Sequence, residues 1–144
     1  MKQTRLLMGM PITIEIADAE ASAEVFDQAY DFFGYVDETF SPYKETSEVS
    51  RINRGELEPD QASKDLQMIL AHAEYTRQQT NGYFDVMRGG VLNPSGIVKG
   101  WAIWQAAQVA RAAGCRNFYV DAGGDVQVYG QNQRGDRWRV GIRN

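Results

Sequence analysis

The sequence predicts an α+β fold in which a largely antiparallel sheet packs against helices. Residues 10–16 alternate apolar and other side chains, as a strand with one buried face does. Three later segments repeat apolar residues at helical spacing, and the C-terminal part returns to short strand-like runs. Because those last runs follow one another without intervening helices, the order β-α-α-α-β-β-β favours antiparallel pairing over a doubly wound sheet.

The composition is that of an ordinary globular chain. With 144 residues, we expect one domain spanning 1–144. The net charge of −4 gives no electrostatic footprint for nucleic acid. A single cysteine, Cys115, excludes an intrachain disulfide. No apolar run is long enough to span a bilayer and no signal peptide or lipobox cysteine is present, so we expect a cytoplasmic protein.

The first strand, 10–16, precedes a helix capped by Asp18 or Ser22. Its apolar residues recur every three or four positions, at Phe26, Tyr30, Phe33, Val36 and Phe40. Residues 41–48 are predicted to form a polar turn, and residues 49–55 a loop with at most one helical turn. A second helix is predicted to begin after the cap Ser63 and to end before Asn81-Gly82. One face of this helix carries Leu66, Ile69, Leu70, Ala73 and Thr76.

The third helix places a lysine near its start. Ser95 is a suitable N-cap, and the helix is expected to stop at Ala113-Gly114. At about 100° per residue, Lys99 shares a stripe with small or apolar residues, namely Ile103, Ala106, Ala110 and Ala113. Lys99 either joins the unpaired N–H groups of the first turn in binding an anion, or extends its ammonium into water along an apolar surface.

The last predicted strands are 118–120, 126–129 and 138–142. Gly123-Gly124, between the first two, is either a hairpin turn or a place where the backbone approaches a ligand closely. The chain ends directly after the third strand, so we expect an open sheet edge through which it could form a homodimer.

Few other residues are candidates for catalysis, metal binding or ligand binding. His72, the sole histidine, is expected to border solvent, and Cys115 to pack as a small hydrophobe. There is no His/Cys cluster for a transition metal, although a hard metal held by oxygens is allowed. Tyr43 and the run Tyr83-Phe84-Asp85 are either local packing residues or the walls of a site for a planar ligand.

Together, these motifs resemble the FAD:protein FMN transferase (ApbE) family. The matching segments, in family order, are MGMPITIE at 8–15, FSPY at 40–43 followed by SEVSRIN at 47–53, TNGYFDV at 80–86, SGIVKGWA at 95–102, DAGGDV at 121–126 and WRVGI at 138–142.

The resemblance implies an enzyme that splits FAD at its pyrophosphate with Mg²⁺ and joins FMN to a threonine or serine of an acceptor flavoprotein. It also implies the FAD contacts, which are Met8, Tyr43, Tyr83, Phe84, Asp85, Asn93 and Lys99. The backbone carbonyl of Gly96 would be a Mg²⁺ ligand. Asn93 stands where the family usually has an aspartate, so an acceptor is kept while a charge is lost.

Two departures accompany the resemblance. The segment 85–93 is short where many members carry an insertion. Family members also continue beyond the last strand into a portion with a histidine motif and the Asp and Thr that complete the metal site. We therefore expect this chain to be an incomplete domain with weak or no transfer activity. The alternative is a non-catalytic flavin-binding or assembly module that pairs through its open edge.

Overall fold

The computed structural model describes residues 1–143 and divides into two compact units. The first unit comprises residues 1–34 and the chain from Trp101 onward, and the second comprises residues 35–100. Within the described residues, no helix is both long and apolar enough to cross a membrane.

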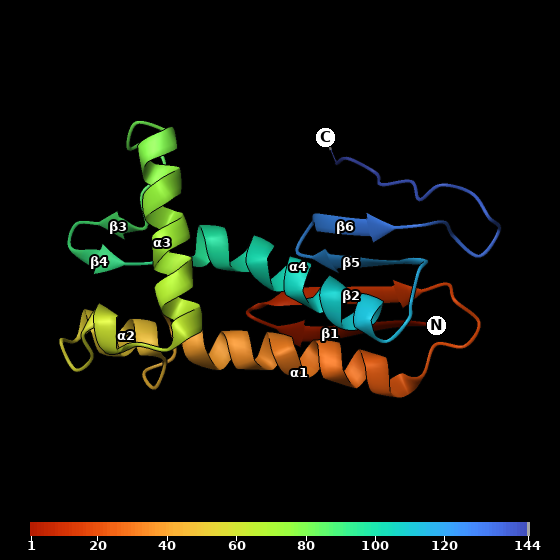
Figure 1. Cartoon of the computed structure of the whole chain (residues 1–144), viewed down its shortest axis with the longest axis horizontal. Coiled ribbons are helices and arrows are strands. Elements are labelled where there is room, and N and C mark those ends of the chain that lie inside the picture. The colour runs from red at the N-terminus through yellow and green to blue at the C-terminus, as the bar shows by residue number, and fades with distance from the viewer. Residues whose placement is uncertain (144) are drawn as a thin grey trace. The chain divides into compact units, whose positions relative to one another are not determined.

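The first unit contains a four-stranded antiparallel sheet with the order β1-β2-β5-β6 (Figure 1). The strands are β1 (Lys2–Leu7), β2 (Met10–Ile16), β5 (Phe118–Ala122) and β6 (Asp125–Tyr129). Ile14 of β2 pairs with Val120 of β5, which in turn pairs with Gln127 of β6. The predicted α+β class with an antiparallel sheet is confirmed.

One face of this sheet forms the core of the first unit. The inward side chains of β2 and β5 are at most 1% exposed, and they are Ile12, Ile14, Ile16, Phe118, Val120 and Ala122. Helices α1 (Ala23–Phe40) and α4 (Ser95–Ala112) run alongside the sheet (Figure 1). The Tyr30 hydroxyl of α1 donates to the carbonyls of Gln3 (2.8 Å) and Ile12 (3.1 Å), which ties α1 to the sheet backbone.

Both hairpins of this sheet turn through residues with positive φ. Met8 (φ 53°) and Gly9 (φ 71°) join β1 to β2, whereas Gly123 (φ 59°) and Gly124 (φ 97°) join β5 to β6. Two consecutive positive φ angles match the twist of two-residue hairpins. The hairpin interpretation of Gly123-Gly124 is therefore confirmed. Met8 holds this conformation without being glycine, which is uncommon for a long side chain.

The second unit contains one long helix and several short elements around a smaller core. They are α2 (Glu48–Asn53), the 3₁₀ turn η1 (Pro59–Gln61), α3 (Lys64–Gln79), β3 (Met87–Arg88) and β4 (Val91–Leu92). Ser63 caps α3 as predicted, because its hydroxyl accepts from Leu66 N at 3.2 Å. The buried apolar side chains here are Val36, Phe40, Val49, Ala62, Leu66, Ile69, Ala73, Leu92 and Val98.

Several local predictions needed correction. Residues 138–142 are not a strand, since they pair with no other segment in the described chain; Val140 is 56% and Ile142 92% exposed. An alternating pattern forms a strand only where a neighbour accepts its backbone hydrogen bonds. Ser95 is the first residue of α4 rather than its cap.

Three elements lacked a sequence signal strong enough to identify them. Strand β1 lies at the sheet edge and has no fully buried residue, and β3 and β4 have two residues each. Residues 49–55, predicted as a loop with at most one helical turn, begin within the six-residue helix α2 (Glu48–Asn53). His72 is exposed and Cys115 is 7% exposed, as predicted for both.

One polar clamp connects the two chain segments of the first unit. The Asp18 carboxylate accepts hydrogen bonds from Arg116 N (3.0 Å), Asn117 N (2.8 Å) and Asn117 Nδ2 (3.1 Å). Burial opposes ionisation, but the hydrogen bonds from Asn117 and Arg116 outweigh it and lower the pKa of Asp18 below its ordinary 3.8.

We expect Asp18→Ala to lower the free energy of unfolding by about 1–2 kcal/mol at neutral pH, because it removes a charged acceptor from three donors. A depressed folded-state pKa stabilises the fold above the ordinary pKa, and this contribution is lost as the pH falls through the folded value. Urea unfolding of the variant and of the unmodified chain at pH 7 and about pH 2.5 measures the difference in their free energies of unfolding, which should be smaller at the lower pH. A difference that stays constant between the two pH values would contradict the assignment.

Candidate functional site

The candidate site surrounds the start of α4 in the second unit. Pro94 O accepts hydrogen bonds from Ile97 N and Val98 N at 3.0 Å, and Asn93 Oδ1 accepts from Ser95 N at 3.1 Å. The side chain of Asn93, not Ser95, therefore caps this end of the helix. We call the group Phe84, Asp85, Asn93, Gly96 and Lys99 the α4 entrance.

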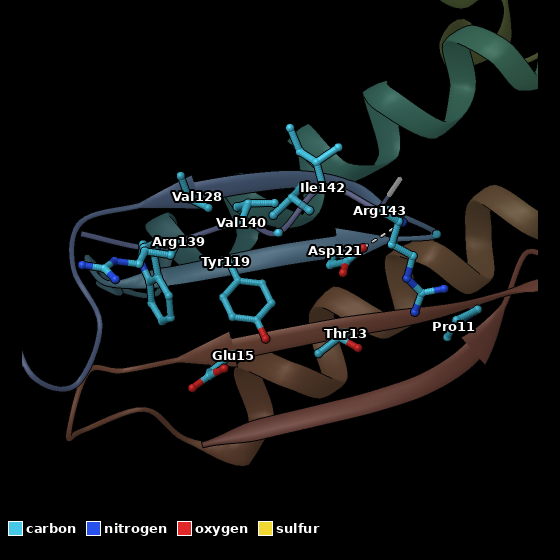
Figure 2. A pocket seen from close by; sticks show the side chains of 15 residues that line it. Pro11, Thr13, Glu15, Tyr119, Asp121, Val128, Arg139, Val140, Ile142 and Arg143 are labelled. Atoms are coloured by element: carbon cyan, nitrogen blue, oxygen red, sulfur yellow. Dashed lines mark hydrogen bonds between the residues drawn. The ribbon is translucent and has the colours of Figure 1, made fainter. Parts of the chain in front are cut away.

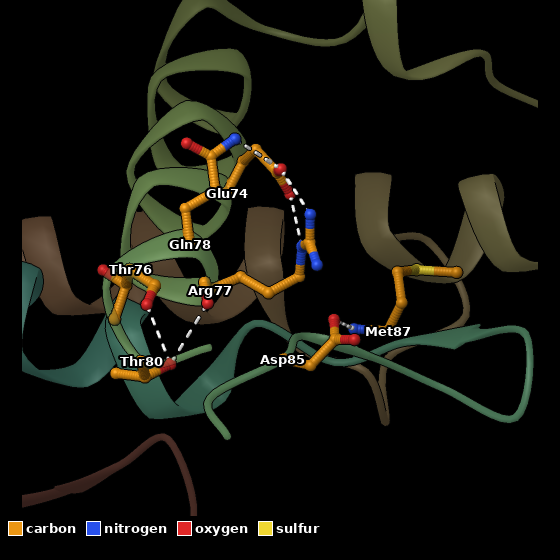
Figure 3. Close-up of polar contacts among 7 residues, drawn as sticks. All are labelled: Glu74, Thr76, Arg77, Gln78, Thr80, Asp85 and Met87. Carbon is orange, nitrogen blue, oxygen red and sulfur yellow. Dashed lines mark hydrogen bonds and ion pairs between the residues drawn. The ribbon is translucent and has the colours of Figure 1, made fainter. Parts of the chain in front are cut away.

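Phe84 is brought to the α4 entrance by the end of α3. Thr80 Oγ1 accepts from Phe84 N at 3.0 Å and donates to Thr76 O at 2.9 Å, as Figure 3 shows for the latter bond. A Cβ atom built on Gly96 would lie 3.2 Å from Phe84 Cε2. Glycine at position 96 thus allows the ring to lie directly against the first turn of α4.

Lys99 follows Gly96 by three residues, so the two share a helix face. Its side chain is half-buried. Along its predicted stripe, Ile103 (4% exposed), Ala106 (0%) and Ala110 (2%) are buried, whereas Ala113 is exposed. The inward direction of the stripe is therefore confirmed up to Ala110. The choice between anion binding and solvation of the ammonium stays a prediction.

Asp85 faces a small apolar cavity of about 450 Å³ within the second unit. Its Oδ1 accepts from Met87 N at 2.9 Å, which fixes the turn into β3 (Figure 3). Arg77 lies nearby and binds Glu74 through two hydrogen bonds of 2.8 Å. Donation from Arg77 and Gln78 lowers the pKa of the Glu74 carboxyl to about 2. The apolar lining comes from Ile52, Pro59, Leu70, Ala73, Val86, Met87 and Leu92.

The two tyrosines predicted at the site are almost fully solvent-exposed. Tyr43 is 89% and Tyr83 90% exposed. Their backbones are nevertheless held, because Tyr43 N donates to Ser41 Oγ (3.2 Å) and Tyr83 N donates to Thr80 O (3.0 Å). An exposed ring on a fixed backbone offers a face for a planar ligand. Met8 belongs to the first unit, at the β1–β2 turn, and is half-exposed.

The described residues do not by themselves make a divalent-metal site. No group of three or more His, Cys, Asp and Glu side chains in residues 1–143 is arranged to hold a metal ion. The Gly96 carbonyl supplies one oxygen, whereas Mg²⁺ takes about six oxygen ligands. The donor set on this chain therefore does not fit a tightly held Mg²⁺.

A second cleft, of about 840 Å³, lies over the outward face of the sheet in the first unit (Figure 2). Tyr119 and Trp138, which meet edge-to-face with ring centroids 5.1 Å apart, line it together with Glu15. Burial raises the pKa of Glu15, but hydrogen bonds from Gln133 and Tyr119, together with the positive charges of Lys2 and the N-terminus, lower it overall. Gly123 and Gly124 also line this cleft, whereas none of the predicted FAD contacts does.

Sequence reasoning missed one polar residue that contacts the segment before α4. Asn53, at the end of α2, exchanges two hydrogen bonds with the backbone of Leu92. The available signal was a polar residue directly after the half-buried Ile52. Its partner is distant in sequence, so no local pattern identifies the contact.

Comparison with known proteins finds relatives that are named flavin transferases. The model of the ApbE family matches residues 8–94 and 89–144. A curated relative, the FAD:protein FMN transferase of Chlamydia muridarum, is 23% identical over 89% of this chain and 55% of its own length. The chain thus spans about half of that relative.

Solved structures show the same fold. A mutant of the flavin transferase ApbE from Vibrio cholerae has a TM-score of 0.90 at 19% identity, covering 99% of this chain and 67% of that one. The apo form of the Pseudomonas stutzeri flavinyl transferase ApbE has a TM-score of 0.85 at 18% identity, covering 99% and 60% respectively. Because the family model extends over almost the whole sequence, the chain belongs to the ApbE family.

Proposed function

We propose that this chain binds FAD at the α4 entrance and forms part of an FAD:protein FMN transferase. The observation that carries the proposal is the approach of Phe84 to Gly96 beside the Asn93 cap, with Lys99 on the same helix face. The name of the Chlamydia relative supplies the reaction class.

The groups at the α4 entrance suit the parts of a dinucleotide. First-turn N–H groups and the Lys99 ammonium favour a pyrophosphate, because both present positive charge. The Phe84 ring of the α4 entrance, and the exposed rings of Tyr43 and Tyr83 outside it, suit stacking on planar groups. Asp85 uses Oδ1 on Met87 N, so Oδ2 can accept from a ligand hydroxyl.

In the proposed reaction, the bond between the FMN phosphorus and the bridging pyrophosphate oxygen breaks, and AMP leaves. A new bond forms from that phosphorus to the oxygen of a threonine or serine hydroxyl of an acceptor flavoprotein, and the proton of that hydroxyl passes to solvent. Lys99 and the helix start would hold the phosphates and neutralise their charge. Gly96 O is the one oxygen that we assign to Mg²⁺ on this chain, and a single carbonyl does not by itself hold the ion.

A second candidate function is flavin binding without transfer, with the chain pairing through the open edge of its sheet. Strands β1 and β6 stand at the two ends of the sheet order, so among the described residues each has an edge on which no further strand is paired. Incubation with FAD, Mg²⁺ and an acceptor flavoprotein distinguishes the two. Covalent flavin fluorescence in a denaturing gel indicates transfer, and FAD binding without that signal indicates a binding module. Absence of FAD binding would overturn both.

We expect Lys99→Ala to weaken FAD binding about tenfold or more, because a charge-assisted contact to phosphate is lost. Titration calorimetry measures the Kd. Lys64→Ala is the charge-matched control, since Lys64 is exposed at the start of α3. Equal affinities of the two variants for FAD would show that the Lys99 ammonium has no role in FAD binding.

We expect Gly96→Ala to weaken FAD binding roughly tenfold without lowering the Tm, since alanine favours helix while its Cβ displaces the Phe84 ring. Gly100→Ala is the matched control, because a Cβ there meets nothing within 4 Å. Calorimetry and thermal unfolding measure both effects. If both variants bound FAD with the affinity of the unmodified chain, contact between Phe84 and the helix start would have no role in binding.

A further inference from the structure

We propose that Asn53 is a positioning residue of the FAD site, which fixes the backbone at Leu92 and thereby the Asn93 cap and the start of α4. This inference rests on the proposed function, because it assigns Asn53 a role at the same site. Asn53 itself is not placed against the ligand.

The contact of Asn53 with Leu92 has the geometry of a strand pairing. Asn53 Nδ2 donates to Leu92 O at 2.9 Å, and Leu92 N donates to Asn53 Oδ1 at 2.8 Å. Both backbone polar groups of Leu92 are therefore bound by one side-chain amide. The side chain of Leu92 is 3% exposed, so the same residue is held by burial as well.

The segment that Asn53 holds has little support of its own. Strands β3 and β4 have two residues each, and isolated hairpins of this kind are at best marginally stable. The next residue, Asn93, donates from its backbone N to Val86 O at 2.8 Å and caps Ser95 N with its side chain. A displacement of Leu92 would consequently move the cap and the first turn of α4.

Helix α2 is itself fixed at its other end by hydroxyl contacts. Ser47 Oγ donates to Ser41 O at 2.5 Å, and Ser50 Oγ contacts Pro42 O at 3.4 Å, directly before Tyr43. Glu48 accepts from Ser63 N (2.8 Å) and Ser63 Oγ (2.7 Å) at the start of α3. A helix of six residues is unstable alone, so these contacts make it rigid enough to position Leu92.

Asparagine suits this position because one planar amide supplies a donor and an acceptor side by side. An ionised aspartate keeps the acceptor for Leu92 N but places a second oxygen against Leu92 O. Alanine removes both contacts. A protonated aspartic acid restores a donor, so the Asn53→Asp variant should recover as the pH falls.

The experiment compares FAD affinity and amide hydrogen exchange in Asn53→Ala, Asn53→Asp and the unmodified chain. We expect both variants to raise the Kd for FAD about tenfold to a hundredfold at pH 7, because the cap is misplaced. The amides of Leu92, Ile97 and Val98 should exchange faster. For N53D, the Kd relative to that of the unmodified chain should fall between pH 7 and about pH 4.

Asp18→Asn is the control for general loss of stability, since it weakens a comparable clamp in the first unit. It should lower the Tm while leaving FAD affinity within about twofold. The proposal is overturned if faster exchange at Leu92 leaves FAD affinity unchanged, or if D18N weakens FAD binding as much as N53A. If the unmodified chain does not bind FAD, the proposed function fails first and the positioning role falls with it.

Discussion

The pairing of β2 with β5 is the constraint on which the first unit depends. It joins the N-terminal hairpin to the C-terminal hairpin in one register, from Ile12 opposite Ala122 to Ile16 opposite Phe118. Because side chains alternate across a strand, this register places every buried residue of both strands on the same face. A shift of one residue would expose Ile14 and Val120, which are almost fully buried.

The second unit is held by a different kind of interaction. Its core is smaller, and its short elements are joined by side-chain groups that satisfy backbone donors and acceptors at helix ends and loops. Glu48 binds the cap of α3, Thr80 binds Phe84 N, and Asn53 binds Leu92. Such contacts are directional, since hydrogen bonds weaken steeply away from linearity. They can therefore fix loop backbone where apolar contacts alone would allow it to slide.

The strand pairing of the first unit and the side-chain hydrogen bonds of the second unit suit different roles, a stable frame and an accessible site. A sheet with a continuous buried face makes a stable frame, whereas a site for a polar ligand needs backbone and side chains held while their outer surfaces stay accessible. Tyr83 illustrates this, because its ring is 90% exposed although Thr80 O accepts its backbone N–H. Gly96 illustrates it as well, since the missing side chain leaves room for Phe84 against the helix.

The sequence by itself determined the long elements and their buried faces, because an apolar repeat over many residues requires a matching surface. The helices 23–40, 64–79 and 95–112, the strand at 10–16 and the Gly123-Gly124 turn were all predictable in this way. The order of motifs also indicated the family. Tertiary structure alone decided that the backbone of 138–142 forms no strand pairing within the described chain, that Asn93 caps α4, and that Asn53 binds Leu92. The physical reason is that these outcomes depend on partners distant in sequence or on the exact end of a helix, and a local pattern contains no information about either.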